Sequence, residues 1–148
     1  MKTIYGKKCL FDTNILIAGR IENHSFHTQA KEIFSDLREN RFTAFISVQN
    51  IMEYSSVLMK GYGLSHREMR KNITDLILLP GIGVIYPSPM STDLYLEMIE
   101  KYSMMFVYDL YLLATALSNG VDVIISGDRD FSKVKEIEFY NPFRSSKN

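Results

Sequence analysis

The stretch that decides the fold is Cys9-Leu10-Phe11-Asp12-Thr13-Asn14-Ile15-Leu16. Its first three residues are apolar and predict a short buried strand over 9–11, and a short helix is expected over 14–18. Asp12 stands between the two elements, at the carboxyl end of the strand. In an open parallel α/β sheet, ligands bind outside the carboxyl ends of the strands. This stretch therefore predicts a parallel sheet with a carboxylate at its ligand-binding edge.

The rest of the chain alternates short apolar runs with helical periodicity. Strands are expected at 42–46, 83–86, 123–126 and 138–140. Helices are expected at 26–37, at 48–59 after Ser47, and up to residue 77 from the capping box Ser65-His66-Arg67-Glu68. Two more are expected, one capped by Ser91 or Thr92 and ending near 102, and one over about 108–119. The alternation predicts βαβ units and an α/β fold, a three-layer α/β/α domain with a short, mostly parallel twisted sheet.

Length and composition favour a single globular domain over residues 1–148, with a polar end at 144–148 that is expected to fray. The chain is 46% hydrophobic, and its 17 basic and 17 acidic side chains give a net charge of zero. That balance argues against a broad basic face for nucleic acid, although a local basic rim stays compatible with it. The one cysteine, Cys9, is expected to be buried and inert. No apolar stretch is long enough for a membrane span, so a cytoplasmic protein without membrane contact is expected.

Five acidic residues fall where the expected elements would carry them to one edge of the sheet: Asp12, Glu53, Asp109, Asp128 and Asp130. Carboxylates crowded at one place repel each other, and their pKa values rise until some take up protons unless a cation is bound. Divalent ions such as Mg²⁺ prefer oxygen ligands. The pattern therefore predicts a divalent-metal site suited to phosphodiester chemistry.

Each acid taken alone also has a structural interpretation. Asp12 can N-cap the short helix that follows it. Glu53 can face solvent, and Asp109 can stabilise a helix start through the helix dipole. Asp128 and Asp130 can belong to a turn rich in Asp, Gly and Ser. All five would then have to reach these element ends by coincidence, so their joint placement favours a functional site.

Four segments in order resemble the PIN-domain nucleases, and within them the VapC-type toxins. They are Leu10-Phe11-Asp12-Thr13-Asn14-Ile15-Leu16-Ile17, Ser47-Val48-Gln49-Asn50-Ile51-Met52-Glu53-Tyr54, the segment from Tyr108-Asp109 to Ala114-Thr115-Ala116, and Ser126-Gly127-Asp128-Arg129-Asp130-Phe131. The resemblance runs nearly end to end. It implies a metal-dependent endoribonuclease that hydrolyses RNA, the toxin of a toxin–antitoxin pair, with an antitoxin partner and a homodimer.

With that chemistry, Mg²⁺ or Mn²⁺ is the expected cofactor, and the acids receive distinct roles. Asp12 and Asp109 are assigned as direct metal ligands. Asp128 would be a ligand or hold a metal-bound water, and Glu53 would position or deprotonate the nucleophile. Asp130 and Asn14 are supporting candidates.

Two other functions remain open from the residues. The first is a non-catalytic PIN-like module that binds RNA or protein, which loss of one of the acids would favour; none is lost. The second is a receiver-like or phosphatase-like phosphotransfer domain with Asp12 as the acyl-phosphate nucleophile. That chemistry predicts a second acid beside Asp12, and Asp12-Thr13-Asn14 does not supply it.

Overall fold

A five-stranded sheet forms the centre of the protein, and all its strand pairs are parallel. The computed structural model describes residues 1–143, so the fraying expected at 144–148 lies outside the described residues. The strands are β1 (Lys8–Phe11), β2 (Thr43–Ser47), β3 (Ile82–Ile85), β4 (Val123–Ile125) and β5 (Glu138–Tyr140). The helices are α1 (Thr13–Arg20), α2 (His27–Arg38), α3 (Val48–Tyr62), α4 (His66–Ile77), α5 (Pro89–Lys101) and α6 (Val107–Ser118), with a short 3₁₀ helix η1 at Arg129–Lys133.

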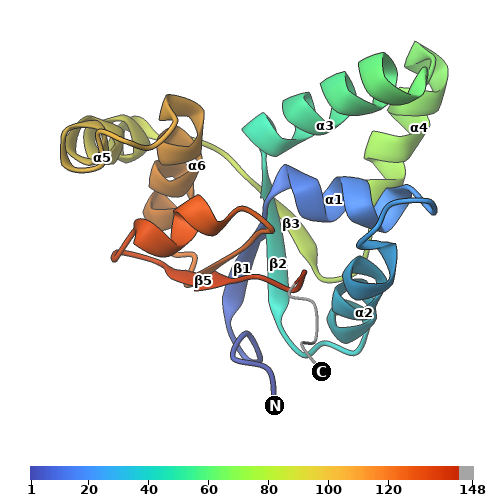
Figure 1. Cartoon of the computed structure of the whole chain (residues 1–148), viewed down its shortest axis with the longest axis horizontal. Helices are drawn as coiled ribbons and strands as arrows, with labels where there is room; N and C mark the ends of the chain where they lie inside the picture. Colours follow the sequence, from blue (N-terminus) through green and yellow to red (C-terminus); the bar gives the residue numbers. More distant parts are fainter. Residues whose placement is uncertain (144–148) are drawn as a thin grey trace.

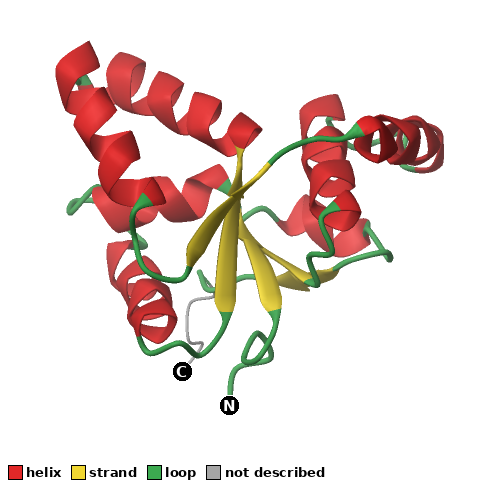
Figure 2. Ribbon diagram, turned by 180° about the vertical axis from the view of Figure 1, so that it is seen from behind, coloured by secondary structure: helices red, strands yellow, loops and turns green. Residues whose placement is uncertain are grey.

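Helices cover both faces of the sheet, which confirms the expected three-layer α/β/α fold (Figures 1 and 2). Alternate residues of β1 enter different cores: Cys9 and Phe11 pack with residues of α1 to α4, whereas Leu10 packs with residues of α5 and α6. A strand buried on both faces is apolar, as β4 is throughout and as β1 is after its exposed first residue, Lys8. None of the helices in residues 1–143 is both long and apolar enough to cross a membrane.

The strand order β3-β2-β1-β4-β5 places a topological switch point between β1 and β4. From β1 the chain builds the sheet outward through β2 and β3, and β4 then pairs on the other side of β1. The pairing aligns Phe11 with Ile125, the last residue of each strand. The Asp12 amide also donates to the Ile125 carbonyl at 3.0 Å. Asp12 therefore lies beside the segment that follows β4, where ligands bind in open α/β sheets.

Two capping boxes begin helices where the sequence predicts them. At α3, Ser47 Oγ accepts a hydrogen bond from the Asn50 amide, and Asn50 Oδ1 accepts one from the Ser47 amide. At α4, Ser65 and Glu68 exchange the same pair of bonds. These bonds satisfy amides that a helix start leaves unpaired.

The expected cap at Ser91 or Thr92 is wrong. α5 begins at Pro89 with Ser88 at the N-cap position, and Ser91 Oγ accepts from the Ser88 amide at 2.8 Å. Pro87 and Pro89 follow the expected strand at 83–86, where they suggest the end of that strand rather than the start of a helix. Proline is favoured in the first helical turn, however, because its missing N–H has no partner there.

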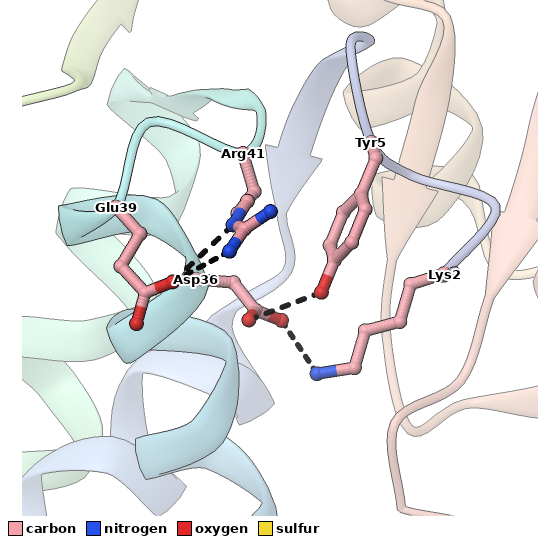
Figure 3. A network of polar contacts seen from close by, with 5 residues as sticks. All are labelled: Lys2, Tyr5, Asp36, Glu39 and Arg41. Carbon is pink, nitrogen blue, oxygen red and sulfur yellow. Dashed lines mark hydrogen bonds and ion pairs between the residues drawn. The ribbon is translucent and has the colours of Figure 1, made fainter.

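The segment before β1 is fastened to the end of α2 (Figure 3). Lys2 Nζ lies 2.5 Å from Asp36 Oδ2, and the Tyr5 hydroxyl donates to Asp36 Oδ1 at 3.2 Å. Arg41 pairs with Glu39 just beyond the helix. The carboxylates of Asp36 and Glu39 are therefore engaged on this side of the molecule.

Candidate active site at the carboxyl edge of the sheet

Asp12 is held in a buried network at the switch point, with 8% of its surface exposed. Its Oδ1 accepts from the Thr13 amide at 2.8 Å. Its Oδ2 accepts from Ser126 Oγ at 2.6 Å and from Asn14 Nδ2 at 3.0 Å. The capping interpretation of Asp12 is thus realised, because Asp12 is the N-cap of α1. The same bonds fix the direction of its carboxylate and join the ends of β1 and β4.

Glu53 is turned toward the start of α1 rather than toward solvent. Its Oε2 accepts from Thr13 Oγ1 at 2.8 Å, and its Oε1 accepts from Gln49 Nε2 at 3.0 Å. The Thr13 hydroxyl is itself oriented by Asn50 Nδ2, which donates to it at 3.2 Å. Gln49 Nε2 also donates to the Tyr108 carbonyl at 2.9 Å, across to α6. A chain of amides and one hydroxyl therefore positions Glu53 between α1, α3 and α6.

Asp109 lies in the first turn of α6, and its side chain is half-buried. Within residues 1–143 no group donates a hydrogen bond to its carboxylate, and the N-cap position is held by Phe106 without a side-chain bond. Burial, followed by the negative charges of neighbouring acids, raises the pKa of Asp109 from 3.8 to about 6. Those acids, from the largest effect to the smallest, are Asp12, Asp128, Glu53 and Asp130.

Asp128 and Asp130 form a turn that begins η1. Asp128 Oδ1 accepts from the Asp130 amide at 2.9 Å, and Ser126 Oγ accepts from the Asp128 amide at 3.0 Å. The turn interpretation of Asp128 therefore fits its local geometry. Asp130 Oδ1 lies 2.8 Å from Lys133 Nζ in an exposed ion pair, so part of its charge is compensated.

The acids share one edge of the sheet and act on each other electrostatically. Burial is also the main cause that raises the pKa of Asp12, and Glu53 and Asp128 add to it against the hydrogen bonds from Ser126 and Thr13. Among the 143 described residues, however, no three His, Cys, Asp or Glu side chains stand together in a way that could hold a metal ion directly. The charges of the other four acids all act on Asp109, and each of those four carboxylates is engaged by its own donor.

Several residues that organise this edge escaped the sequence analysis as site residues. Thr13, Gln49 and Asn50 orient Glu53, and Ser126 links Asp12 to the loop after β4. A signal existed for Asn50, because its spacing of three from Ser47 is that of a capping box. The spacing of four between Gln49 and Glu53 was a local signal for one bond of Gln49, but its second partner is a backbone carbonyl of α6, far away in the sequence.

Comparison with known proteins connects this geometry to one family. The PIN domain model matches residues 9–137. No curated protein sequence matches the chain. Similar solved structures include VapBC2 from Rickettsia felis bound to a promoter DNA fragment, with a TM-score of 0.70 and 16% identity over 90% of this chain and 98% of that one.

Two further structures are similar over most of both chains. VapC20 of Mycobacterium tuberculosis, described as a sarcin-ricin loop cleaving toxin, has a TM-score of 0.69 and 17% identity over 88% of this chain and 98% of that one. A toxin–antitoxin complex from Klebsiella pneumoniae has a TM-score of 0.65 and 25% identity over 93% and 99%. With a family match over most of its length, the chain belongs to the PIN-domain family of nucleases and has the fold of the VapC-type toxins.

Proposed function

We propose that this protein is a metal-dependent endoribonuclease that hydrolyses phosphodiester bonds of RNA, and that it is the toxin of a toxin–antitoxin pair. The observation that carries the proposal is the Asp109 carboxylate. It is half-buried, has no hydrogen-bond donor within residues 1–143, and has a pKa raised to about 6 by burial and four other acids. A carboxylate in that setting is stabilised by a cation.

Asp109 and Asp12 are proposed to hold a Mg²⁺ or Mn²⁺ ion. Asp128 would be a further ligand or hold a water on that ion, and Asp130 and Asn14 would act in support. A hydrated ion is proposed, since no three of the described side chains gather closely enough to hold an ion directly, and Mg²⁺ keeps several waters and needs few direct carboxylate ligands. When bound, such an ion lowers the pKa of a water and neutralises charge on the phosphate.

Glu53 is proposed to position or deprotonate the water that attacks phosphorus. Thr13 and Gln49 hold its two oxygens in one orientation, so little conformational freedom is lost when substrate binds. Asn14 donates to Asp12 and to Ser126 Oγ, and its Oδ1 accepts from the Gly127 amide at 3.1 Å. Asn14 therefore keeps the loop after β4 in place beside Asp12.

An antitoxin partner and a homodimer are also proposed. The antitoxin proposal is supported by the 25% identical relative, which is itself a toxin–antitoxin complex. A second copy of the chain is supported by large apolar side chains exposed on α5, on the loop after it and at the start of α6: Met90, Leu96, Ile99, Met104, Phe106, Val107 and Tyr108. These side chains come from two helices that pack against each other and from the loop between them, and large exposed apolar patches mark interaction sites. Cleavage of RNA would place the protein in the cytoplasm.

The test is cleavage of a labelled RNA by purified protein with Mg²⁺, with Mn²⁺ and with chelator. Asp109→Asn and Asp12→Asn are expected to lower kcat/KM by a factor on the order of 10² or more. Asp93→Asn changes an exposed acid in α5 and serves as the charge-matched control. Cleavage that persists in chelator, or in a rigorously purified Asp109→Asn protein, would point to a different site.

The non-catalytic module remains the competing function, and one observation favours it. The carboxylates of Asp12 and Asp128 already form helix-start bonds that a purely structural role would explain. It predicts RNA or protein binding without cleavage in any divalent ion. The phosphotransfer domain is disfavoured because Asp12-Thr13-Asn14 supplies no second acid beside Asp12.

A further inference from the structure

A pocket of about 280 Å³ lies between α1, α2, α3 and α4, apart from the acidic edge. α1 separates the two places: Asp12 precedes its first turn, whereas Gly19 and Arg20 line the pocket from its last turn and Leu16 from its middle. At about 1.5 Å of rise per residue, Arg20 lies roughly 12 Å along the helix from Asp12. The pocket is therefore a separate site.

Three cationic side chains line this pocket: Arg20, Lys31 and Arg38. In the part of the chain that the structure describes, none of the three forms an ion pair. Asp75 is the single carboxylate among the lining residues, and its Oδ2 is bound by Lys71 Nζ at 2.6 Å. The pocket thus carries an excess of positive charge, to which an anion is attracted.

Arg20 is oriented rather than free. Its Nε donates to Asn72 Oδ1 at 2.6 Å, so the guanidinium is fixed against α4. The terminal nitrogens of Arg20 donate no hydrogen bond within residues 1–143. A fixed guanidinium with free terminal N–H groups suits the bidentate binding of phosphate or carboxylate.

Tyr54 supplies a further polar group to the pocket. Only 4% of Tyr54 is exposed, and it lines the pocket. Its hydroxyl has no hydrogen-bond partner in residues 1–143, although no fully buried side-chain atom there lacks one. The hydroxyl therefore opens into the pocket. A hydroxyl that reaches solvent in a pocket is hydrated there and is free to donate to a ligand that displaces that water.

One wall of the pocket is a face of α2, on which the Phe34 ring packs closely against α1. Lys31, Phe34 and Arg38 are spaced by three and four, which places them on one face of α2. A Cβ on Gly19 would lie 2.5 Å from Phe34 Cε2, so glycine allows the ring to lie against α1. Asp36 is turned away to Lys2 and Tyr5 (Figure 3) and does not neutralise the cations of this face.

We infer that this pocket binds a phosphate-bearing ligand of nucleotide size, with Arg20 on the phosphate, Tyr54 donating to it, and Phe34 against the apolar part. Its volume is near the lower end of small-molecule pockets, which begin at about 300 Å³. The ligand is a free mononucleotide or one nucleotide of an RNA strand, since both present the same phosphate and base. The inference does not depend on the proposed nuclease activity.

The experiment measures binding to the full chain in chelator, where metal-dependent cleavage is stopped. Calorimetry with 5′-AMP and with adenosine tests the free nucleotide, and fluorescence anisotropy with a labelled eight-nucleotide RNA tests the strand. We expect Arg20→Gln to weaken binding about tenfold or more and Tyr54→Phe to weaken it severalfold. Arg67→Gln, an exposed charge on α4 outside the pocket, should leave it unchanged.

Each outcome decides the inference. Binding of 5′-AMP with these losses assigns the pocket to a free nucleotide, and the same losses with RNA alone assign it to a strand. Equal affinity for adenosine overturns the inference, as does a wild-type protein that binds neither phosphate probe. Arg20-dependent binding of a glutamate-rich peptide in their place also overturns it and assigns the pocket to a protein segment. Tyr54→Phe keeps the ring that packs in the core, so thermal melts can verify that this variant folds.

Discussion

Replacing Asp109 by Asn removes one negative charge from the acidic edge while keeping the shape of the side chain. The pKa of Asp109 is raised from 3.8 to about 6, first by burial and then by the surrounding carboxylates. An acid with a raised pKa in the folded state binds protons more tightly there than in the unfolded chain. Below pH 3.8 the group is protonated in both states, and its ionisation does not lower the free energy of unfolding. Between pH 3.8 and about 6 the free energy of unfolding falls as pH rises, and above about 6 the loss is complete.

The magnitude follows from the same pKa. A rise from 3.8 to about 6 corresponds to about 3 kcal/mol at 1.36 kcal/mol per pKa unit. Because Asp109 is only half-buried, solvent screening reduces the effect to roughly 1–2 kcal/mol. Loss of the favourable helix-dipole interaction subtracts roughly 0.3–1 kcal/mol. Asp109→Asn is thus expected to be as stable as wild type or slightly more stable at pH 7.5, with no gain at pH 4.

Metal binding is expected to make wild type more stable than Asp109→Asn. A ligand that binds only the native state stabilises it by about 2.7 kcal/mol at a hundredfold excess over its Kd, a rise in Tm of roughly 5–10 °C for a chain of this size. Wild type should show this rise with Mg²⁺, and Asp109→Asn should show much less.

The assay is a set of thermal melts at pH 4 and pH 7.5, in chelator and in excess Mg²⁺, with Asp93→Asn as the control. An Asp109→Asn protein that is destabilised by about 0.5–2 kcal/mol in chelator, yet responds to Mg²⁺ as wild type does, would show that Asp109 stabilises the helix start. That result would refute the metal site.

Three further predictions test other parts of the structure. Gln49→Ala removes both bonds of Gln49, so kcat should fall about tenfold with KM nearly unchanged while stability falls by about 0.5–1.5 kcal/mol; RNA-cleavage kinetics and melts check this. Gly127→Ala would place a Cβ 2.6 Å from Phe143 Cδ2 and should cost about 1–3 kcal/mol, measured by chemical denaturation, with partial recovery in a double variant that also carries Phe143→Leu. Phe106→Ser should weaken the proposed homodimer in sedimentation velocity, whereas Leu78→Ser, which also replaces an exposed apolar side chain, should not.

The fold follows from local patterns because most of its elements obey them. Every expected strand and helix has a counterpart in the structure, and the two capping boxes at Ser47 and Ser65 mark helix starts directly. The start of α5 was misplaced because a proline after a strand has two interpretations. It can end the strand, or it can stand in the first turn of a helix, as Pro89 does. The short helix η1 was not expected, since its turn residues carry no helical periodicity.

The site was predictable only in part, because local signals identify residue types and not the direction of side chains. The placement of Asp12 after β1 and of Asp128 after β4 follows from the parallel topology. Glu53 faces α1 because Thr13 and Gln49 hold it there. Thr13 lies 40 positions from Glu53 in the chain, and Gln49 lies 4 positions from it. The bond from Gln49 to the Tyr108 carbonyl spans 59 positions, and no periodicity encodes it.

An acid can have a structural and a functional role at once. The number of hydrogen bonds that its carboxylate accepts shows how much of it serves the fold. A carboxylate has about four lone-pair sites. Asp12 uses three of them, one on Oδ1 for Thr13 and two on Oδ2 for Ser126 and Asn14. In Asp12→Asn, an N–H group of the new side chain would face the N–H group of Asn14, and two donors cannot bond. The loss of folding stability would then obscure the loss of metal binding. The Asp109 carboxylate accepts no bond in residues 1–143, and its substitution therefore separates metal binding from folding where that of Asp12 does not.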